Sequence, residues 1–382
     1  DPIMAKGLEG FRKRWSHPSD DGEALRVQAC LSPVWDTALA TLGLLDSGLP
    51  PDHEAIQRAA RWFMQEEIRV KGDWAVLNPG IEPSGWAFEF ENDMYPDIDD
   101  SSIIVMDVAG ARMTDEAEEL QRQAVVARST AWMTAMRSRN GGWGAFDKDN
   151  DASYLAKIPF ADFGELLDPP SVDVTAHVVE MYGRLGHTKD DPLVAPGLAL
   201  IWREQEPDGA WFGRWGVNYI YGIGSVLPAL AAVGEDMEQR RVRRSVDWLV
   251  AHQNDDGGWG ESPASYVDPS LRGQGDSTAS QTAWALVGLL AAGEREHAAT
   301  RRGIAYLVRS QAADGTWDEP QFTGCGFPGY GCGDQPEHYR EVGDPGWQGL
   351  ELGSGFMINY HLYRNYFPLW ALGRYVGKAS SG

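Results

Sequence analysis

The chain has little cysteine, no long apolar run and few basic residues. Its three cysteines, Cys30, Cys325 and Cys332, form no CxxC pair and no zinc-ligand spacing. Three thiols without a pairing pattern fit a reducing compartment, and no metal site is expected. No secretory signal and no run of about 18 apolar residues is present, so we expect no membrane-spanning helix.

Acidic residues outnumber basic ones by 56 to 33 in a chain of 382 residues, which gives a formal net charge of −23. This charge argues against nucleic acid as a partner and against electrostatic docking onto anionic lipid. No segment shows strand alternation between hairpin turns, so no strands are expected. What the chain has in abundance is tryptophan and glycine, with 16 and 44 residues.

Many of these tryptophans belong to a repeat. The pattern QxxDGxW occurs at 205–211, 253–259 and 311–317, with a degenerate copy at 137–143 and a weaker one ending at Trp74. Each copy follows an amphipathic stretch and precedes a more apolar one. The glycine ends a helix and the tryptophan can cover the turn. We interpret the tryptophans at 211, 259 and 317 as structural braces of the loops.

Polar-faced and apolar helices alternate along the chain. We predict polar-faced helices at about 3–14, 52–67, 115–137, 192–204, 237–252 and 295–310. We predict apolar helices at about 32–45, 99–112, 171–184, 217–233, 277–292 and 359–376. Apolar helices belong inside a ring and amphipathic ones outside it. The sequence therefore predicts an all-α fold: one α6/α6 barrel domain, residues 1–382, of six inner and six outer helices.

The stretch Asp97-Ile98-Asp99-Asp100 places three carboxylates at the start of a predicted inner helix. One interpretation is a negatively charged N-cap that complements the helix dipole. The other is a proton donor, because three carboxylates this close cannot all ionise comfortably and at least one pKa should rise. His177 lies on another inner helix with Asp173 four residues before it, so a carboxylate can hold the ring as imidazolium. Taken alone, such a pair is also typical of a helix surface.

These motifs together resemble the squalene-hopene cyclases, from about residue 5 to residue 375. The repeats are similar to the QW motifs of triterpene cyclases, and Asp97 to Asp100 look like the DxDD acid motif. The segments 32–37, 213–219 and 173–177 resemble the same family. The resemblance implies that Asp99 is the proton donor, that Asp97 and Asp100 orient it, and that His177 hydrogen-bonds it. No cofactor and no metal are implied.

The resemblance also implies a cavity lined by aromatic side chains, which stabilise cations without acting as nucleophiles. The positions that match the family's cavity are Trp35, Phe88, Trp143, Phe163, Trp215, Tyr221, Phe327, Phe356, Tyr360 and Tyr363. Phe160 and Ala161 match the loop that gates the substrate channel. One departure from the family is Phe146, where a tyrosine is usual.

The activity implied is cyclisation of squalene to hopene-type or hopanol-type pentacycles, begun by protonation of a terminal alkene. The family acts at one leaflet of the bacterial membrane, so we expect a monotopic protein on the cytoplasmic side, with homodimerisation left open. Position 1 is Asp, and the family carries a second, inserted barrel. We therefore expect this chain to be a fragment that lacks the N-terminal barrel.

Several alternatives remain at this point. A cyclase of a prenyl diphosphate would keep the acid motif but needs basic residues for the diphosphate, and Arg214 is the one exception in nearly lysine-free cavity segments. An isolated half could be inactive without its missing barrel. A carbohydrate-active α6/α6 protein would need two separated carboxylates, and a zinc prenyltransferase subunit would need Asp, Cys and His ligands. A purely structural αα scaffold would not need the acid motif.

Overall fold

The structure is a computed structural model that describes residues 1–18, 25–27, 30–90, 92–152, 167–266, 268–327 and 356–377. Its inner helices are α2 (Pro33–Asp46), α4 (Ile98–Gly110), α6 (Val172–Arg184), α8 (Tyr219–Ala232), α10 (Ala279–Ala291) and α13 (Tyr363–Val376). Its outer helices are α3 (Glu54–Glu66), α5 (Glu116–Met136), α7 (Ala195–Arg203), α9 (Arg240–Ala251) and α11 (Ala298–Ser310). Short turns of π- or 3₁₀-helix lie at Phe11–Trp15 (η1), Asp73–Val76 (η2), Pro263–Tyr266 (η5) and Pro269–Leu271 (η6).

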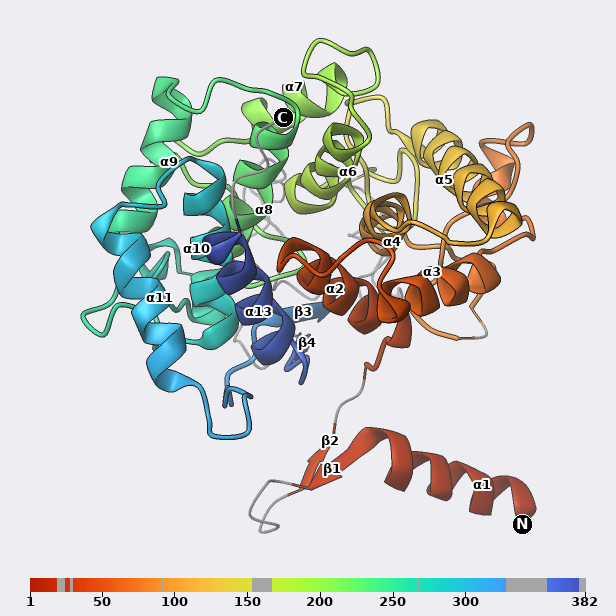
Figure 1. Ribbon diagram of the computed structural model, residues 1–382, viewed down its shortest axis with the longest axis horizontal. Helices are drawn as coiled ribbons and strands as arrows, with labels where there is room; N and C mark the ends of the chain where they lie inside the picture. The colour runs from red at the N-terminus through yellow and green to blue at the C-terminus, as the bar shows by residue number, and fades with distance from the viewer. Residues whose placement is uncertain are drawn as a thin grey trace.

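The inner helices close a ring. Each packs against the next in chain order, and α13 packs against both α10 and α2, which completes the circle (Figure 1). The outer helices lie against this ring: α3 contacts α2 and α4, α5 contacts α4, α7 contacts α6, α9 contacts α8 and α10, and α11 contacts α10. The predicted αα-barrel is confirmed. It arises because the inner helices are buried on nearly every side, whereas the outer helices bury only one face.

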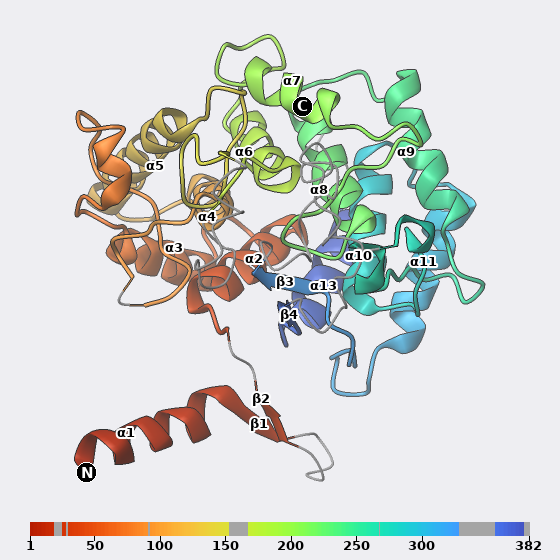
Figure 2. The same ribbon diagram turned by 180° about the vertical axis from the view of Figure 1, so that it is seen from behind.

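The N-terminal region departs from the prediction. Helix α1 (Pro2–Gly10) was expected as the sixth outer helix, but it has no buried residue and lies apart from the ring in both views (Figures 1 and 2). The expectation of no strands is also corrected. Two antiparallel pairs occur, β1 (Ser16–Pro18) with β2 (Leu25–Val27) and β3 (Gly324–Phe327) with β4 (Phe356–Ile358). Strands of three or four residues are too short for alternation to show in the sequence.

The repeated motif is explained by its hydrogen bonds. The indole Nε1–H of Trp143, Trp211, Trp259 and Trp317 in each case donates to the backbone carbonyl ten residues earlier, at 2.7–2.8 Å. Those carbonyls belong to the last turn of the preceding outer helix, where the regular donor four residues later is missing. At Leu249 the N–H of His252 also donates, at 3.3 Å. The motif glycine has a positive φ of 91–102° at Gly209, Gly257 and Gly315, a region that favours glycine.

The motif glutamine ties neighbouring repeats together. The side-chain amide of Gln253 donates to the carbonyl of Gly257 in its own turn and to that of Ala299 in the next outer helix, both at 2.8 Å. Gln205 makes the equivalent bonds to Gly209 and Arg241. In the first repeat the brace is Trp86, which donates to the carbonyl of Phe63, so the weak copy ending at Trp74 was the wrong segment.

The loops after the tryptophans lead to the starts of the inner helices. Backbone bridges join Trp86 to Asp97, Trp143 to Ser171 and Trp259 to Thr278, each at the start of an inner helix. The N-termini of the inner helices therefore meet at one end of the barrel, where their dipoles favour negative charge. Among the described residues no helix is long and apolar enough to cross a bilayer.

The tryptophan brace can be tested by Trp259→Phe. We expect this change to lower the free energy of unfolding by about 0.5–1.5 kcal/mol, because it removes the 2.7 Å hydrogen bond to the Leu249 carbonyl and leaves only the longer bond from the His252 N–H, at 3.3 Å. Urea unfolding followed by circular dichroism measures the change. Trp62→Phe is the matched control, since Trp62 is only half-buried on outer helix α3. Equal effects at the two positions would contradict the brace.

Candidate active site

The acidic stretch begins α4, and its first carboxylate is the cap. Oδ1 of Asp97 accepts the backbone N–H groups of Asp99 and Asp100, at 2.7 and 3.2 Å. Two loops hold this helix start from outside: the N–H of Asp97 donates to the carbonyl of Trp86 and that of Ile98 to the carbonyl of Ala145, each at 2.7 Å. Asp99 therefore stands in the first turn of a helix whose position is determined by two loops.

Asp99 is hydrogen-bonded to His177. Helix α6 packs against α4 and brings Nδ1 of His177 to 2.6 Å from Oδ1 of Asp99, with the His177 and Asp99 side chains only 9% and 11% exposed. Burial on its own lowers the pKa of His177. The charge of Asp99 and its hydrogen bond act in the opposite direction and, with smaller contributions from other acids, raise the pKa above its usual value. The charge and the hydrogen bond of Asp99 therefore favour the protonated ring.

The surroundings of the two flanking acids favour their neutral forms. Burial raises the pKa of Asp97 well above its usual range, and the charge of Asp99 adds to this. Burial also raises the pKa of Asp100, with the charges of Asp97 and Asp99 acting in the same direction, and Asp100 is hydrogen-bonded to the Asp97 side chain. The expectation that at least one pKa in the stretch rises is therefore met by two of the three acids.

Asp173 does not hold His177 by a hydrogen bond. Its Oδ2 accepts the backbone N–H groups of Arg214 and Trp215, at 2.9 and 2.8 Å. Asp173 is in the first turn of α6, so its side chain lies at the barrel end with the loops, while His177 is one turn deeper. Asp173 instead braces the 214–215 loop by its hydrogen bonds. Its charge does raise the pKa of His177, as predicted, but less than the charges of Asp99 and Glu180.

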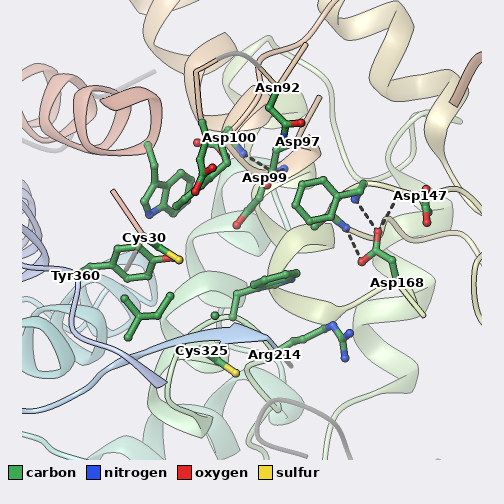
Figure 3. A pocket seen from close by; sticks show the side chains of 18 of the residues that line it. Cys30, Asn92, Asp97, Asp99, Asp100, Asp147, Asp168, Arg214, Cys325 and Tyr360 are labelled. Atoms are coloured by element: carbon green, nitrogen blue, oxygen red, sulfur yellow. Dashed lines mark hydrogen bonds between the residues drawn. The ribbon is translucent and has the colours of Figure 1, made fainter. Parts of the chain in front are cut away.

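Beside the acid lies a cavity of about 430 Å³ (Figure 3). Its aromatic lining comes from Trp35, Phe88, Phe146, Trp215, Tyr221, Tyr360 and Tyr363. The rings of Tyr360 and Tyr363 are stacked, with their centroids 4.6 Å apart. The Nε1–H of Trp35 donates to the Tyr363 hydroxyl at 3.0 Å. Because the hydrogen bond fixes one phenol and the stack fixes the other, both ring faces are held in place beside the acid.

The structure brings together most of the predicted lining. Trp35, Phe88, Trp215, Tyr221, Tyr360 and Tyr363 all border the cavity. Trp143 is a correction: it is fully buried, does not border the cavity, and makes the brace bond of the repeat. Phe160, Ala161 and Phe163 lie outside the described residues. The structure describes only the backbones of Phe327 and Phe356, which pair at one end of β3 and β4.

Asp168 and Cys30 are among the cavity residues that the sequence analysis did not assign to the site. Asp168 borders the cavity, and its carboxylate accepts the backbone N–H groups of Ala145, Phe146 and Asp147 at 2.6–3.1 Å. It thereby holds the loop whose carbonyl receives Ile98 of α4. Cys30 borders the same cavity, and burial raises the pKa of its thiol to about 11. Both residues precede their helices in loops without a motif, so the sequence offered no signal.

Three buried acids at the start of an inner helix, one of them bonded to a histidine, lie beside an aromatic cavity in an αα-barrel. The chain belongs to the squalene-hopene cyclase C-terminal domain family, whose model matches residues 31–342.

Curated relatives agree with this assignment. The chain is 45% identical over 374 residues to squalene–hopene cyclase of Alicyclobacillus acidocaldarius, covering 98% of this chain and 54% of that protein. It is 41% identical to dammaradiene synthase of Dryopteris crassirhizoma over 398 residues, with the same coverage of 98% and 54%. The chain thus spans about half the length of the curated relatives it matches.

A solved structure shows the same fold. The type II terpene cyclase MstE from Scytonema superposes with a TM-score of 0.59 at 18% identity, covering 97% of this chain and 95% of that one. At this level of identity the likeness extends to the barrel alone.

The neutral state of Asp100 can be tested through the pH dependence of stability. A carboxyl whose pKa is raised by folding binds more protons in the folded state, so stability is lost as the pH rises above about 4. Asp100→Asn removes that contribution, and we expect its free energy of unfolding to fall less steeply from pH 5 to pH 8 than that of the wild type.

Urea unfolding at pH 5, 6, 7 and 8 measures this slope. Asp93→Asn is the matched control, because Asp93 is exposed and lies in the loop just before the acidic stretch. A parallel pair of curves for the Asp100→Asn variant and the wild type would contradict a buried neutral carboxyl.

Proposed function

We propose that this protein cyclises squalene to hopene-type pentacyclic triterpenes, with Asp99 as the proton donor. The observation that carries the proposal is the hydrogen-bonded Asp99–His177 pair beside a cavity of aromatic side chains. The curated relatives named squalene–hopene cyclase, at 43–45% identity, support the same substrate and reaction.

The first step transfers the carboxylic proton of Asp99 to one carbon of a terminal double bond. A C–H bond forms, the π bond is consumed, and the other carbon becomes a tertiary cation. Asp99 is left as a carboxylate, and the adjacent His177 imidazolium stabilises that charge through the 2.6 Å hydrogen bond. Asp97 and Asp100, being neutral, add no negative charge that would oppose the ionisation of Asp99.

The later steps move the positive charge along the folded polyene as rings close. Each aromatic face is worth roughly 0.5–2 kcal/mol to a nearby cation. The stacked Tyr360 and Tyr363 and the edge-to-face pair Phe146–Trp215 supply such faces around the cavity. The last cation loses a proton to give an alkene or takes up water to give an alcohol.

The competing substrate class is a prenyl diphosphate. Arg214 is the one basic residue of the described part of the chain that borders the cavity. Its guanidinium carbon Cζ lies 5.9 Å from the centroid of the Trp215 ring. Six acidic residues border the same cavity: Glu89, Asp97, Asp99, Asp100, Asp147 and Asp168. Even with Asp97 and Asp100 neutral, the remaining acids outnumber the single arginine, and this disfavours a group with two or three negative charges. An apolar polyene meets no such repulsion.

The proposal is tested by incubating the protein with squalene and, separately, with geranylgeranyl diphosphate, and reading the products by mass spectrometry. We expect hopene or hopanol from squalene, and at least about a hundredfold less product with Asp99→Asn. Asp93→Asn serves as control, and circular dichroism checks the helical content of both variants. Cyclised diphosphate without hopene, or full activity of the Asp99→Asn variant, would overturn the proposal.

We also infer that the protein works at a lipid surface, on the cytoplasmic side of the membrane. The support is chemical: squalene dissolves in the hydrocarbon of a bilayer, and the cavity is lined mainly by apolar rings. With a net charge of −23, binding should depend on apolar contact and not on anionic lipid.

Flotation with phosphatidylcholine vesicles tests this inference. We expect the protein to float with neutral vesicles and to remain bound at about 0.5 M salt, where surface charges are screened. Binding that requires anionic lipid and is lost in salt, or no binding to either kind of vesicle, would contradict it.

A further inference from the structure

Helix α6 carries a second carboxylate close to His177 on the side away from the acid. Glu180 lies three residues beyond His177, so the two side chains are neighbours on one helix face. Glu180 is almost fully buried, and its Oε1 binds both Arg184 and Arg374 at 2.9 Å. Arg374 belongs to α13, across the ring. The mechanism described so far makes no use of this buried carboxylate.

His177 and Glu180 share a small internal cavity, separate from the one beside the acid. It has a volume of about 20 Å³, room for about one water molecule, and is bordered by both side chains together with Tyr221, Ser225 and Trp284. Nδ1 of His177 faces Asp99, so Nε2 lies on the opposite side of the ring. Nε1 of Trp284 is buried and has no hydrogen-bond partner in the described part of the protein.

We propose that Glu180 is a positioning residue for the acid: through this cavity it faces the far side of His177 and keeps the ring protonated. The inference rests on the proposed function, because it assigns a role to the His177–Asp99 pair in proton donation. The cavity is lined mainly by apolar side chains, but the Glu180 carboxylate and His177 both border it, and its volume suits one water that bridges Glu180 to His177 Nε2–H.

Several charged or titratable groups lie near the His177 ring, and among those other than Asp99, Glu180 has the largest effect on it. The groups near it are Asp99 on α4, Tyr221 on α8, Asp46 on α2, Arg374 on α13, and Asp173 and Arg184 on α6 itself. The charged residue of α7, Arg203, is exposed. After Asp99, the charge of Glu180 contributes most to the raised pKa of His177, ahead of Asp173. Burial raises the pKa of Glu180, but Arg184 and Arg374 outweigh it and hold the pKa below its usual value, so the group stays ionised.

The test is the titration of His177 in the folded protein, followed by NMR of ¹⁵N-labelled histidine. The chain has eight histidines, and the signal that is lost in His177→Gln identifies the ring. We expect Glu180→Gln to move the midpoint to lower pH by about one unit, since a nearby negative charge is removed. Arg374→Gln should move it to higher pH, because it removes a positive charge from the same cluster.

A charge effect moves the His177 midpoint in opposite directions in Glu180→Gln and Arg374→Gln. A loss of packing would move the midpoint in the same direction in both variants. Glu180→Asp keeps the charge and should restore most of the shift. Glu294→Gln is the matched control: Glu294 is also a partly buried partner of an arginine, Arg243, but lies after α10 and away from the ring interior. The same midpoint in Glu180→Gln, Glu294→Gln and the wild type would overturn the proposal.

Kinetics provide the second measurement. The alkaline limb of kcat/KM for squalene should shift with the NMR midpoint in each variant. Because the NMR titration needs no turnover, it tests the role of Glu180 independently of the proposed function. A wild type that forms no product contradicts the proposed function. An unchanged His177 midpoint in Glu180→Gln contradicts the role of Glu180. Melting temperatures of all variants check that the barrel is intact.

Discussion

The site depends on the alignment of the inner helices. Their N-termini meet at one end of the ring, and the unsatisfied N–H groups there favour negative charge. Acidic side chains occupy that end: Asp97 caps α4, Asp173 binds the 214–215 loop, Glu261 binds the start of α8 and Glu319 binds the start of α10. Asp99, the proton donor that we propose, is thus one of several buried acids at the helix N-termini.

Asp99 differs from the other acids in its partner. The other acids accept hydrogen bonds from backbone N–H groups or hydroxyls, and these bonds hold a loop or a helix start in place. Asp99 alone among these acids is bonded to a titratable ring, at the point where a cavity opens. A carboxyl bonded to backbone N–H groups holds a loop or a helix start, whereas the carboxyl bonded to His177 suits the role of proton donor that we propose. The same helix start therefore provides both a cap and an acid.

Much of the barrel could be predicted because each signal was local. The 3.6-residue period separated inner from outer helices, and the cap at Asp97 followed from residue type and position. Trp143 was misplaced because a resemblance to cavity residues was preferred to its own repeat, although the repeat predicted its brace bond. Helix α1 was placed in the ring because periodicity reports that a face is apolar but not which surface it packs against.

The rest of the site could not be predicted because it depends on contacts between distant segments. Asp168 holds residues 145–147, and the importance of that loop appears only once Ala145 is seen to receive the N–H of Ile98. Asp173 and Glu180 flank His177 in sequence at −4 and +3, and either spacing places a carboxylate near the ring. Only the three-dimensional structure shows that the first turns toward a loop and the second shares a cavity with the ring.

An imidazolium inside a dry barrel needs compensation, since an isolated buried charge is strongly disfavoured. The Asp99 carboxyl cannot supply it throughout, because that group is neutral whenever it is loaded with its proton. A second negative charge on the other side of His177 would compensate the imidazolium while Asp99 is protonated. Glu180 is suited to this because Arg184 and Arg374 keep it ionised, and Asp46 pairs with both arginines at the far end of the ring. The acid at one end of the barrel is thus linked electrostatically to an ion network at the other.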